Sequence, residues 1–325
     1  NGHHFRPSFP SPPTRGHFDG VTLHSHDYVD PTTPHDLRGR RVIVVGFGNS
    51  AVDIASELAA RGDAARVVLS VRRGSWVIPK YIRGKPADQG ELIPGWLPEK
   101  FRRRLVTLGF RLLFGKMSDY GLPEPDHLIG EAQPTLSDEL PELVKSGRVV
   151  VRPAIDGFEG KTVVFADGSR EEIDAIVYCT GYHVDFPFFE SSHLSAPDNR
   201  LPLFHRVFHP EHRRVFFVGL AQPLGAIMPI AELQARVIAA HLSGDYNLPE
   251  PDFIAAELDR DERSARERYV SSARHTMQID PKKYRARLIE ELERGRLRAR
   301  AGTGRPFSAS SDDDTPDSPL PSNDP

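Results

Sequence analysis

The segment Gly46–Ala51 is the part of the sequence whose residue types and spacing most directly imply chemistry. It has the pattern G-x-G-x-x-[GA], and it lies between the apolar run Val42–Val45 and the amphipathic stretch Ser50–Arg61. In such a strand–turn–helix unit the first glycine permits a tight turn, the second admits a pyrophosphate, and a small third residue lets the helix pack on the strand. The phosphates bind at the N-terminus of the helix. The pattern therefore predicts a dinucleotide-binding loop; the alternative is a glycine turn before an ordinary helix. The residues expected to contact the cofactor are Gly46, Phe47, Gly48, Asn49, Ser50 and Ala51.

The end of the next strand indicates which dinucleotide is bound. An NAD site has an acidic residue about 20 positions after the glycines, which accepts hydrogen bonds from the ribose hydroxyls. Here the strand Arg66–Ser70 ends in Ser70 and is followed by Arg72 and Arg73, which are donors suited to a 2′-phosphate. This favours NADP(H) over NAD(H). The alternative is that both arginines are only exposed charges.

Composition excludes several classes of protein. The 42 Lys and Arg residues nearly balance the 45 Asp and Glu residues, so no overall field favours nucleic acid or an anionic membrane, and we expect neither as a partner. The single cysteine, Cys179, excludes an internal disulfide, a C-x-x-C pair and a multi-cysteine metal site, and we name no metal ligand. A lone cysteine also favours a reducing compartment, so we expect a cytoplasmic protein. No apolar run approaches the roughly 20 residues of a membrane helix.

The elements around the loop follow from hydrophobic periodicity. Residues 1–40 are rich in Pro, His and Gly, which predicts an ordered linker or a crossing segment, with regular structure beginning at Arg41. Residues 79–98 are irregular, and Glu99–Phe114 has the spacing of an amphipathic helix whose basic face is expected to be solvated. The apolar residues at helical spacing in that stretch are Phe101, Leu105, Leu108 and Leu112.

Further strands are expected downstream. Arg148–Arg152 and Lys161–Phe165 are predicted to form a small antiparallel excursion, with a turn at Asp167-Gly168 that leads into Glu171–Asp174. The main sheet then resumes with Ala175–Cys179, and Val215–Gly219 is predicted as a last buried strand.

The C-terminal part is predicted to be helical. Met228–Leu242 has a proline in its first turn, where proline is tolerated. Two charged helices follow near Phe253–Tyr269 and Pro281–Arg294. Residues from Ala301 onward are dense in Ser, Asp and Pro and predict a disordered tail.

A second motif lies shortly before the glycine loop. Residues 18–28 fit F-x-G-x-x-x-H-x-x-x-[YF] through Phe18, Gly20, His24 and Tyr28. This pattern resembles the identifying motif of the flavin-containing monooxygenases, and its position relative to the loop also fits that family. A histidine in such a setting is more often a structural hydrogen-bonding residue than a catalytic one, so we assign His24 no catalytic role.

Other stretches are similar to the same family in order along residues 1–245. They are Asn49-Ser50, Arg72–Gly74 with Trp76, Cys179–Tyr182 with Phe186–Phe188, Phe217–Pro223 and Ile230–Gln234. The resemblance implies that Thr180 and Gly181 lie where the chain returns to a flavin domain, although an ordinary strand-end turn would look the same. It also implies that Gln222 and Gln234 approach the flavin or the nicotinamide.

The resemblance implies an oxidoreductase that uses NADP(H) and FAD, similar to the N,N-dimethylaniline monooxygenases. In that family NADPH reduces FAD, and the reduced flavin uses O2 to oxygenate a soft nitrogen or sulfur nucleophile of a small molecule. Because the flavin carries this chemistry, we name no catalytic residue. The family begins with an earlier G-x-G-x-x-G for FAD, and only the later pattern occurs here. We therefore expect the N-terminal flavin segment to be absent from this chain.

Two other functions stay open. One is a truncated, catalytically incomplete NADPH-binding fragment; the other is a Baeyer–Villiger-type monooxygenase, although the related motif usually ends in Trp where this chain has Tyr28. A disulfide reductase is excluded because it needs paired cysteines. The expected macromolecular partner is either a second copy of the chain or a separate N-terminal FAD segment.

These inferences predict an α/β fold with three layers. A Rossmann-like NADPH-binding domain is inserted in a partial FAD-binding Rossmann-like domain, and helices close the C-terminus. The predicted boundaries are 1–40 for the linker and flavin-domain remnant, 41–174 for the NADPH domain with a helical insert at about 79–140, 175–245 for a second flavin segment, 246–300 for C-terminal helices and 301–325 for a disordered tail.

Overall fold

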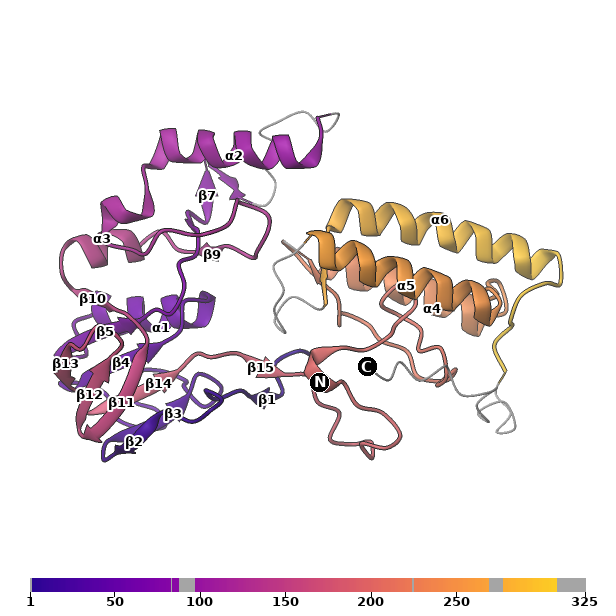
Figure 1. Ribbon diagram of the computed structural model, residues 1–325. Helices are drawn as coiled ribbons and strands as arrows, with labels where there is room; N and C mark the ends of the chain where they lie inside the picture. Colours follow the sequence, from indigo (N-terminus) through magenta and orange to yellow (C-terminus); the bar gives the residue numbers. More distant parts are fainter. Residues whose placement is uncertain (1, 83, 88–96, 224, 269–276, 309–325) are drawn as a thin grey trace. The chain divides into compact units, whose positions relative to one another are not determined.

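The computed structural model describes residues 2–82, 84–87, 97–223, 225–268 and 277–308. The chain forms two compact units (Figure 1). The N-terminal unit is His4–His183, and the C-terminal unit is Val184–Pro325 together with Asn1–His3.

A five-stranded parallel sheet is the centre of the N-terminal unit, in the order β10-β5-β4-β14-β3. All four neighbouring pairs are parallel. The strands are β10 (Val149–Arg152), β5 (Arg66–Ser70), β4 (Arg41–Val45), β14 (Ala175–Tyr178) and β3 (Val21–His24). They are rich in β-branched residues because both faces of the sheet are covered.

The two faces of this sheet pack against different layers (Figure 1). Val42 and Val44 belong to the core shared with α1 (Asn49–Ala60) and α3 (Leu140–Lys145). Ile43 alternates to the other side and packs with residues of a four-stranded sheet, as strand geometry requires. That sheet has the order β13-β12-β11-β2, with β13 (Arg170–Glu172), β12 (Thr162–Phe165), β11 (Ile155–Gly160) and β2 (Arg15–Phe18). The predicted α/β, three-layer arrangement is confirmed for this unit.

Two sequence predictions for this unit were wrong, and one strand was not predicted. Regular structure begins before Arg41, because β3 pairs with β14, β2 pairs with β11, and β1 (Arg6–Pro7) pairs antiparallel with β15 (Tyr182–His183). Strand β10 belongs to the parallel sheet, not to the antiparallel excursion. Strand β11 was not predicted, because its sequence Ile-Asp-Gly-Phe-Glu-Gly lacks an apolar run. The antiparallel pair β12–β13 and its turn at Gly168 are as predicted.

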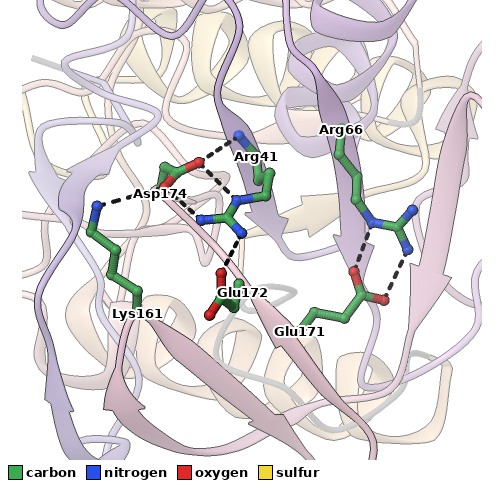
Figure 2. Close-up of polar contacts among 6 residues, drawn as sticks. All are labelled: Arg41, Arg66, Lys161, Glu171, Glu172 and Asp174. Atoms are coloured by element: carbon green, nitrogen blue, oxygen red, sulfur yellow. Dashed lines mark hydrogen bonds and ion pairs between the residues drawn. The ribbon is translucent and has the colours of Figure 1, made fainter.

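Ion pairs hold the two sheets together where β4 and β5 begin (Figure 2). Arg41 donates to both carboxylate oxygens of Asp174 at 2.9 Å and to Glu172 at 2.6 Å. The Arg41 hydrogen bonds hold the pKa of Asp174 well below its usual range. Arg66 donates to Glu171 at 2.8 and 3.2 Å. These contacts fix the two layers at one edge, away from the glycine loop at the opposite ends of the strands.

The insert between β5 and β10 contains short strands and one long helix. The short elements are β6 (Val77–Ile78), β7 (Tyr81–Ile82), β8 (Lys85–Pro86), β9 (Thr135–Leu136) and the 3-10 turn η2 (Met117–Tyr120). Helix α2 (Glu99–Phe114) has the predicted bounds, but most of its predicted apolar stripe is exposed. The helix packs instead through Phe110, whose ring meets Trp76 edge-on at 5.7 Å.

Three helices dominate the C-terminal unit, and a short 3-10 turn, η3 (Pro197–Asn199), precedes them. They are α4 (Met228–Leu242), α5 (Pro251–Arg268) and α6 (Pro281–Arg300), which confirms the predicted helices. Tyr246 is fully buried against Gly295 of α6, where a Cβ atom would lie 2.0 Å from the tyrosine ring. Its hydroxyl donates to buried Glu291, which also pairs with Arg298.

Two predictions for this unit were also wrong. Val215–Gly219 forms no strand; only Phe216 makes an isolated bridge, to Phe208, and Val218 is 53% exposed. The tail does not begin at Ala301, because the backbones of Leu248 and Arg305 exchange hydrogen bonds of 2.9 and 2.7 Å. Tyr269 and residues 309–325 lie outside the described residues. No helix in the described part of the chain is long and apolar enough to cross a bilayer.

Candidate dinucleotide-binding site

The loop Gly46–Ala51 leaves the C-terminal end of β4 and enters α1. Gly46 has φ +130°, and a Cβ atom there would lie 2.5 Å from the carbonyl oxygen of Cys179, the residue after the neighbouring strand β14, so only glycine fits. Gly48 is the N-cap of α1, and the helix start has no side-chain cap. The first intrahelical bond is from the Val52 N–H to the Gly48 carbonyl at 3.1 Å. The preceding N–H groups therefore have no intrahelical acceptor, which is the condition for anion binding.

Two side-chain contacts brace this loop. Thr135 is buried, and its hydroxyl donates to the Phe47 carbonyl at 2.8 Å. The Asn49 side-chain oxygen accepts from the Leu136 N–H at 2.9 Å. Ala51 is fully buried, while Asn49 and Ser50 are exposed. Thr135 was missed by sequence reasoning, because nothing in its local sequence signals a contact 88 residues away.

The three predicted 2′-phosphate residues lie at the C-terminal end of β5 or just after it, but in different environments. Ser70 is buried, and its hydroxyl donates to the Pro153 carbonyl at 2.9 Å, so it is engaged inside the unit. Arg73 donates to both oxygens of Asp126 at 2.7 and 2.9 Å, which lowers the pKa of Asp126 to about 2. Arg72 is exposed and has no ion-pair partner among the described residues. Of the two guanidinium groups, that of Arg72 is thus the more available to an anion.

The four residues of the second motif have structural contacts. A Cβ atom at Gly20 would lie 2.5 Å from the Phe18 ring, so this turn requires glycine. His24 is fully buried; its Nδ1 accepts from the His26 N–H at 3.1 Å, and burial lowers its pKa. The Tyr28 hydroxyl donates to Glu57 of α1 at 3.0 Å. The motif therefore anchors β3 and α1.

Thr180 and Gly181 follow β14 and contact Ser8, the residue after β1. The Thr180 hydroxyl donates to the Ser8 carbonyl, and the Gly181 carbonyl accepts from the Ser8 N–H at 2.9 Å. Gly181 has φ +95°, which favours glycine. This pair shapes the exit of the chain from the parallel sheet.

The two predicted glutamines lie in the C-terminal unit. Gln234 is fully buried; its amide oxygen accepts from the Gly219 N–H, and its nitrogen donates to the Tyr284 hydroxyl, both at 2.8 Å. It is therefore a structural brace of α4. Gln222 is half-buried on β16 (Gln222–Pro223), which pairs with β17 (Gln278–Ile279). Gln278, which sequence reasoning missed, is 5% exposed, and neither atom of its amide has a hydrogen-bond partner in the described part of the chain.

A parallel sheet that presents a glycine loop and an open helix N-terminus defines a dinucleotide-binding α/β protein. The sequence profile of the family described as flavin-binding monooxygenase-like matches residues 1–294. Flavin-containing monooxygenase 5 of Oryctolagus cuniculus is 37% identical over 295 residues, which cover 86% of this chain and 53% of that protein. The chain belongs to the flavin-binding monooxygenase family, and it spans about half the length of the curated relatives it matches.

Solved structures share the fold. S-allyl-L-cysteine S-oxygenase from Allium sativum is 24% identical, with a TM-score of 0.58, over 90% of this chain and 53% of the other. Cyclohexanone monooxygenase from Rhodococcus sp. Phi1, solved with NADP+, is 17% identical, with a TM-score of 0.61, over 91% of this chain and 72% of the other. The family consists of oxidoreductases that use FAD and NADP(H). The predicted family is thereby confirmed, and the predicted enzyme class and cofactors are those of that family.

Proposed function

We propose that the N-terminal unit binds NADP(H), and that this binding serves the FAD-dependent oxygenation of a soft nitrogen or sulfur nucleophile by the whole protein. The observation that carries the proposal is the open N-terminus of α1 directly behind the Gly46 turn. A helix N-terminus with unpaired N–H groups favours a pyrophosphate through both hydrogen bonds and the helix dipole. The residues present therefore fit a dinucleotide.

Each part of the site has a proposed task. The N–H groups of Asn49–Ala51 hold the pyrophosphate, and the Arg72 guanidinium holds the 2′-phosphate. Arg73 adds positive charge that Asp126 partly neutralises. FAD, when bound, supplies the oxygen chemistry of the family.

The proposal includes the predicted division of the chain into an NADPH domain and a flavin segment. Residues 41–174 form the NADPH domain, although the compact unit itself extends to His183. Residues 175–245 carry flavin-side contacts. Gln222 is the side chain within this range proposed for that role. Gln278, which pairs with Gln222 across β16 and β17, is proposed beside it because its amide has no hydrogen-bond partner among the described residues. Gln234 is held in the core by Gly219 and Tyr284.

Oxygenation at nitrogen or sulfur is favoured over the Baeyer–Villiger reaction. The relative named dimethylaniline monooxygenase [N-oxide-forming] 2 of Rattus norvegicus is 36% identical over 277 residues. The second motif ends in Tyr28, whose hydroxyl donates to Glu57, where the Baeyer–Villiger motif usually has Trp. The similarity to cyclohexanone monooxygenase concerns the fold alone, so that reaction is the second candidate. A cytoplasmic location remains a prediction from the single cysteine.

Calorimetric titration of the chain with NADP+ and with NAD+ tests the cofactor proposal. We expect NADP+ to bind at least about tenfold more tightly, because a charge-assisted hydrogen bond contributes about 1.5–3 kcal/mol. Arg72→Ala should remove most of this preference while leaving NAD+ binding unchanged, and Arg73→Ala should have a smaller effect. Equal binding of the two nucleotides, or an Arg72→Ala variant that weakens both equally, would contradict the proposal.

Visible absorption after addition of FAD, followed by NADPH consumption in air, separates the activity from the binding. Bound flavin together with NADPH oxidation supports a monooxygenase site within this chain. NADP+ binding without flavin uptake supports the alternative of an NADPH-binding fragment that needs further sequence.

A further inference from the structure

Three imidazoles and one carboxylate gather in the C-terminal unit, among residues that have no part in the proposed cofactor site. His209, Glu211 and His212 come from the turn that follows Phe208, and one potential ligand atom of each lies within 4.8 Å of those of the other two. His193 comes from the segment before η3, and its ring centroid is 4.2 Å from that of His212. The cluster thus joins two segments about 20 residues apart.

His209 stabilises the conformation of the turn through hydrogen bonds to its backbone. Its side chain is buried, and its Nδ1 accepts from the N–H groups of Glu211 at 3.2 Å and His212 at 3.1 Å. Because Nδ1 is an acceptor, the proton of the neutral ring lies on Nε2. His209 therefore has no free lone pair for a ligand, and it positions the backbone of the two residues beside it.

The side chains of His193, Glu211 and His212 are available to bind a metal ion. Glu211 and His193 are exposed, and His212 is half-buried. Within the described residues the Glu211 carboxylate makes no ion pair, and the ring nitrogens of His193 and His212 make no hydrogen bond. Two imidazoles and a carboxylate are ligands typical of zinc and similar transition metals, whereas Mg²⁺ and Ca²⁺ prefer oxygen ligands alone.

We propose that His193, Glu211 and His212 bind one divalent transition-metal ion, and that His209 positions the turn. Ligand atoms about 2 Å from one zinc ion lie no more than about 4 Å apart, so the exposed side chains rotate inward on binding. Three protein ligands leave a fourth position to water. The ion links the segment at His193 to the turn at His212 and stabilises this part of the C-terminal unit. No cysteine marks this site in the sequence, and its ligands come from two segments about 20 residues apart, so no local motif signals it.

Zn²⁺ titration of the full chain, with any affinity tag removed, tests the proposal by calorimetry. We expect one ion per chain, and binding weakened at least about tenfold in His193→Ala, Glu211→Gln and His212→Ala. His35→Ala, which removes an exposed histidine of the N-terminal unit, is the matched control and should bind as the wild type does.

Two variants of His209 test whether this residue is a metal ligand or only positions the turn. His209→Ala should weaken Zn²⁺ binding about 10- to 100-fold, as loss of a supporting residue does. In His209→Asn the amide oxygen can accept the same backbone N–H groups, so binding should return to within about threefold of the wild type. Visible absorption of bound Co²⁺ should be lost in His212→Ala, and retained in His209→Asn.

Thermal unfolding provides a readout independent of fitting the titration. Zn²⁺ should raise the Tm of the wild type and of His35→Ala, but not that of Glu211→Gln, which alters an exposed side chain and should fold normally. Failure to detect a 1:1 complex, or wild-type affinity in Glu211→Gln and His193→Ala, would overturn the proposal.

Discussion

The N-terminal ends of α1 and α6 differ in whether a side chain accepts hydrogen bonds from their free backbone N–H groups. Both helices expose N–H groups that no intrahelical acceptor satisfies. At α6 the Asp280 carboxylate accepts from the N–H groups of Lys282 and Lys283, both at 3.1 Å. At α1 the N-cap is Gly48, and no side chain caps the helix.

The difference shows which helix end is closed by the protein itself and which is open to a ligand. Lack of a side-chain cap is not enough, because α2 and α4 also lack one. What sets α1 apart is the combination of a glycine loop, exposed residues in the first turn and an approach from a buried parallel strand. These features together favour a phosphate group as the cap of α1.

Gly46→Ala should have the largest effect. The new Cβ would lie 2.5 Å from the Cys179 carbonyl, at a φ of +130° that an alanine rarely adopts. We expect a loss of roughly 3 kcal/mol or more in the free energy of unfolding, measured by urea denaturation, together with loss of NADP+ binding. Gly62→Ala is the control, because Gly62 also has positive φ but no atom within 4 Å of its Cβ position. Equal losses in both variants would refute the steric argument.

Asp280→Ala should destabilise the capped helix without affecting the cofactor. Loss of an N-cap costs about 0.5–2 kcal/mol, and we expect a corresponding fall in Tm with unchanged NADP+ affinity. Asp280→Asn, which retains an acceptor, should restore most of the stability. If Asp280→Ala weakened NADP+ binding, the contrast between the two helix ends would fail.

Acid should weaken the contact between the two sheets of the N-terminal unit. The pKa of Asp174 is lower in the folded state than its usual value near 3.9, so its contribution is complete above about pH 4 and is lost as pH falls further. Asp174→Asn should therefore cost roughly 1 kcal/mol at pH 7, since the pair is partly exposed, and this cost should shrink below pH 4. Urea denaturation at pH 7 and pH 3 checks this, and a difference independent of pH would count against it.

Asn49→Ala should have the smallest effect. It removes the acceptor of the Leu136 N–H but leaves the helix N–H groups in place. We expect NADP+ to bind about three- to fivefold more weakly, with stability lowered by about 1 kcal/mol. Asn49→Asp, which keeps the acceptor but adds a negative charge at the phosphate position, should weaken NADP+ binding more than Asn49→Ala does. The opposite order would argue against an anion at this helix end.

Local signals in the sequence were sufficient for the glycine loop and the long helices. Gly46–Ala51 lies where the spacing predicts, and α2 and α4 have the predicted bounds. Strand β3 could not be predicted in this way, because its four residues become a strand only by pairing with β14, about 150 residues later. The strand predicted at Val215–Gly219 does not form for the converse reason, because an apolar run without a partner strand forms no ladder.

The same limit applies to the candidate site. Residue type and position identified Arg72 and Arg73 together, but only the structure separates them, because Asp126 lies 53 residues from Arg73. Ser70 was predicted as a phosphate donor, yet its hydroxyl bonds to Pro153. Which donors are free depends on tertiary contacts that no local pattern encodes.

Hydrogen–deuterium exchange with and without NADP+ tests the central claim most directly. A phosphate bound at the start of α1 should slow exchange of the amides of residues 48–52, while the amides at the start of α6, already capped by Asp280, should be unaffected. Protection at α6, or none at α1 when NADP+ is bound, would contradict the claim that the open end of α1 is the cofactor site.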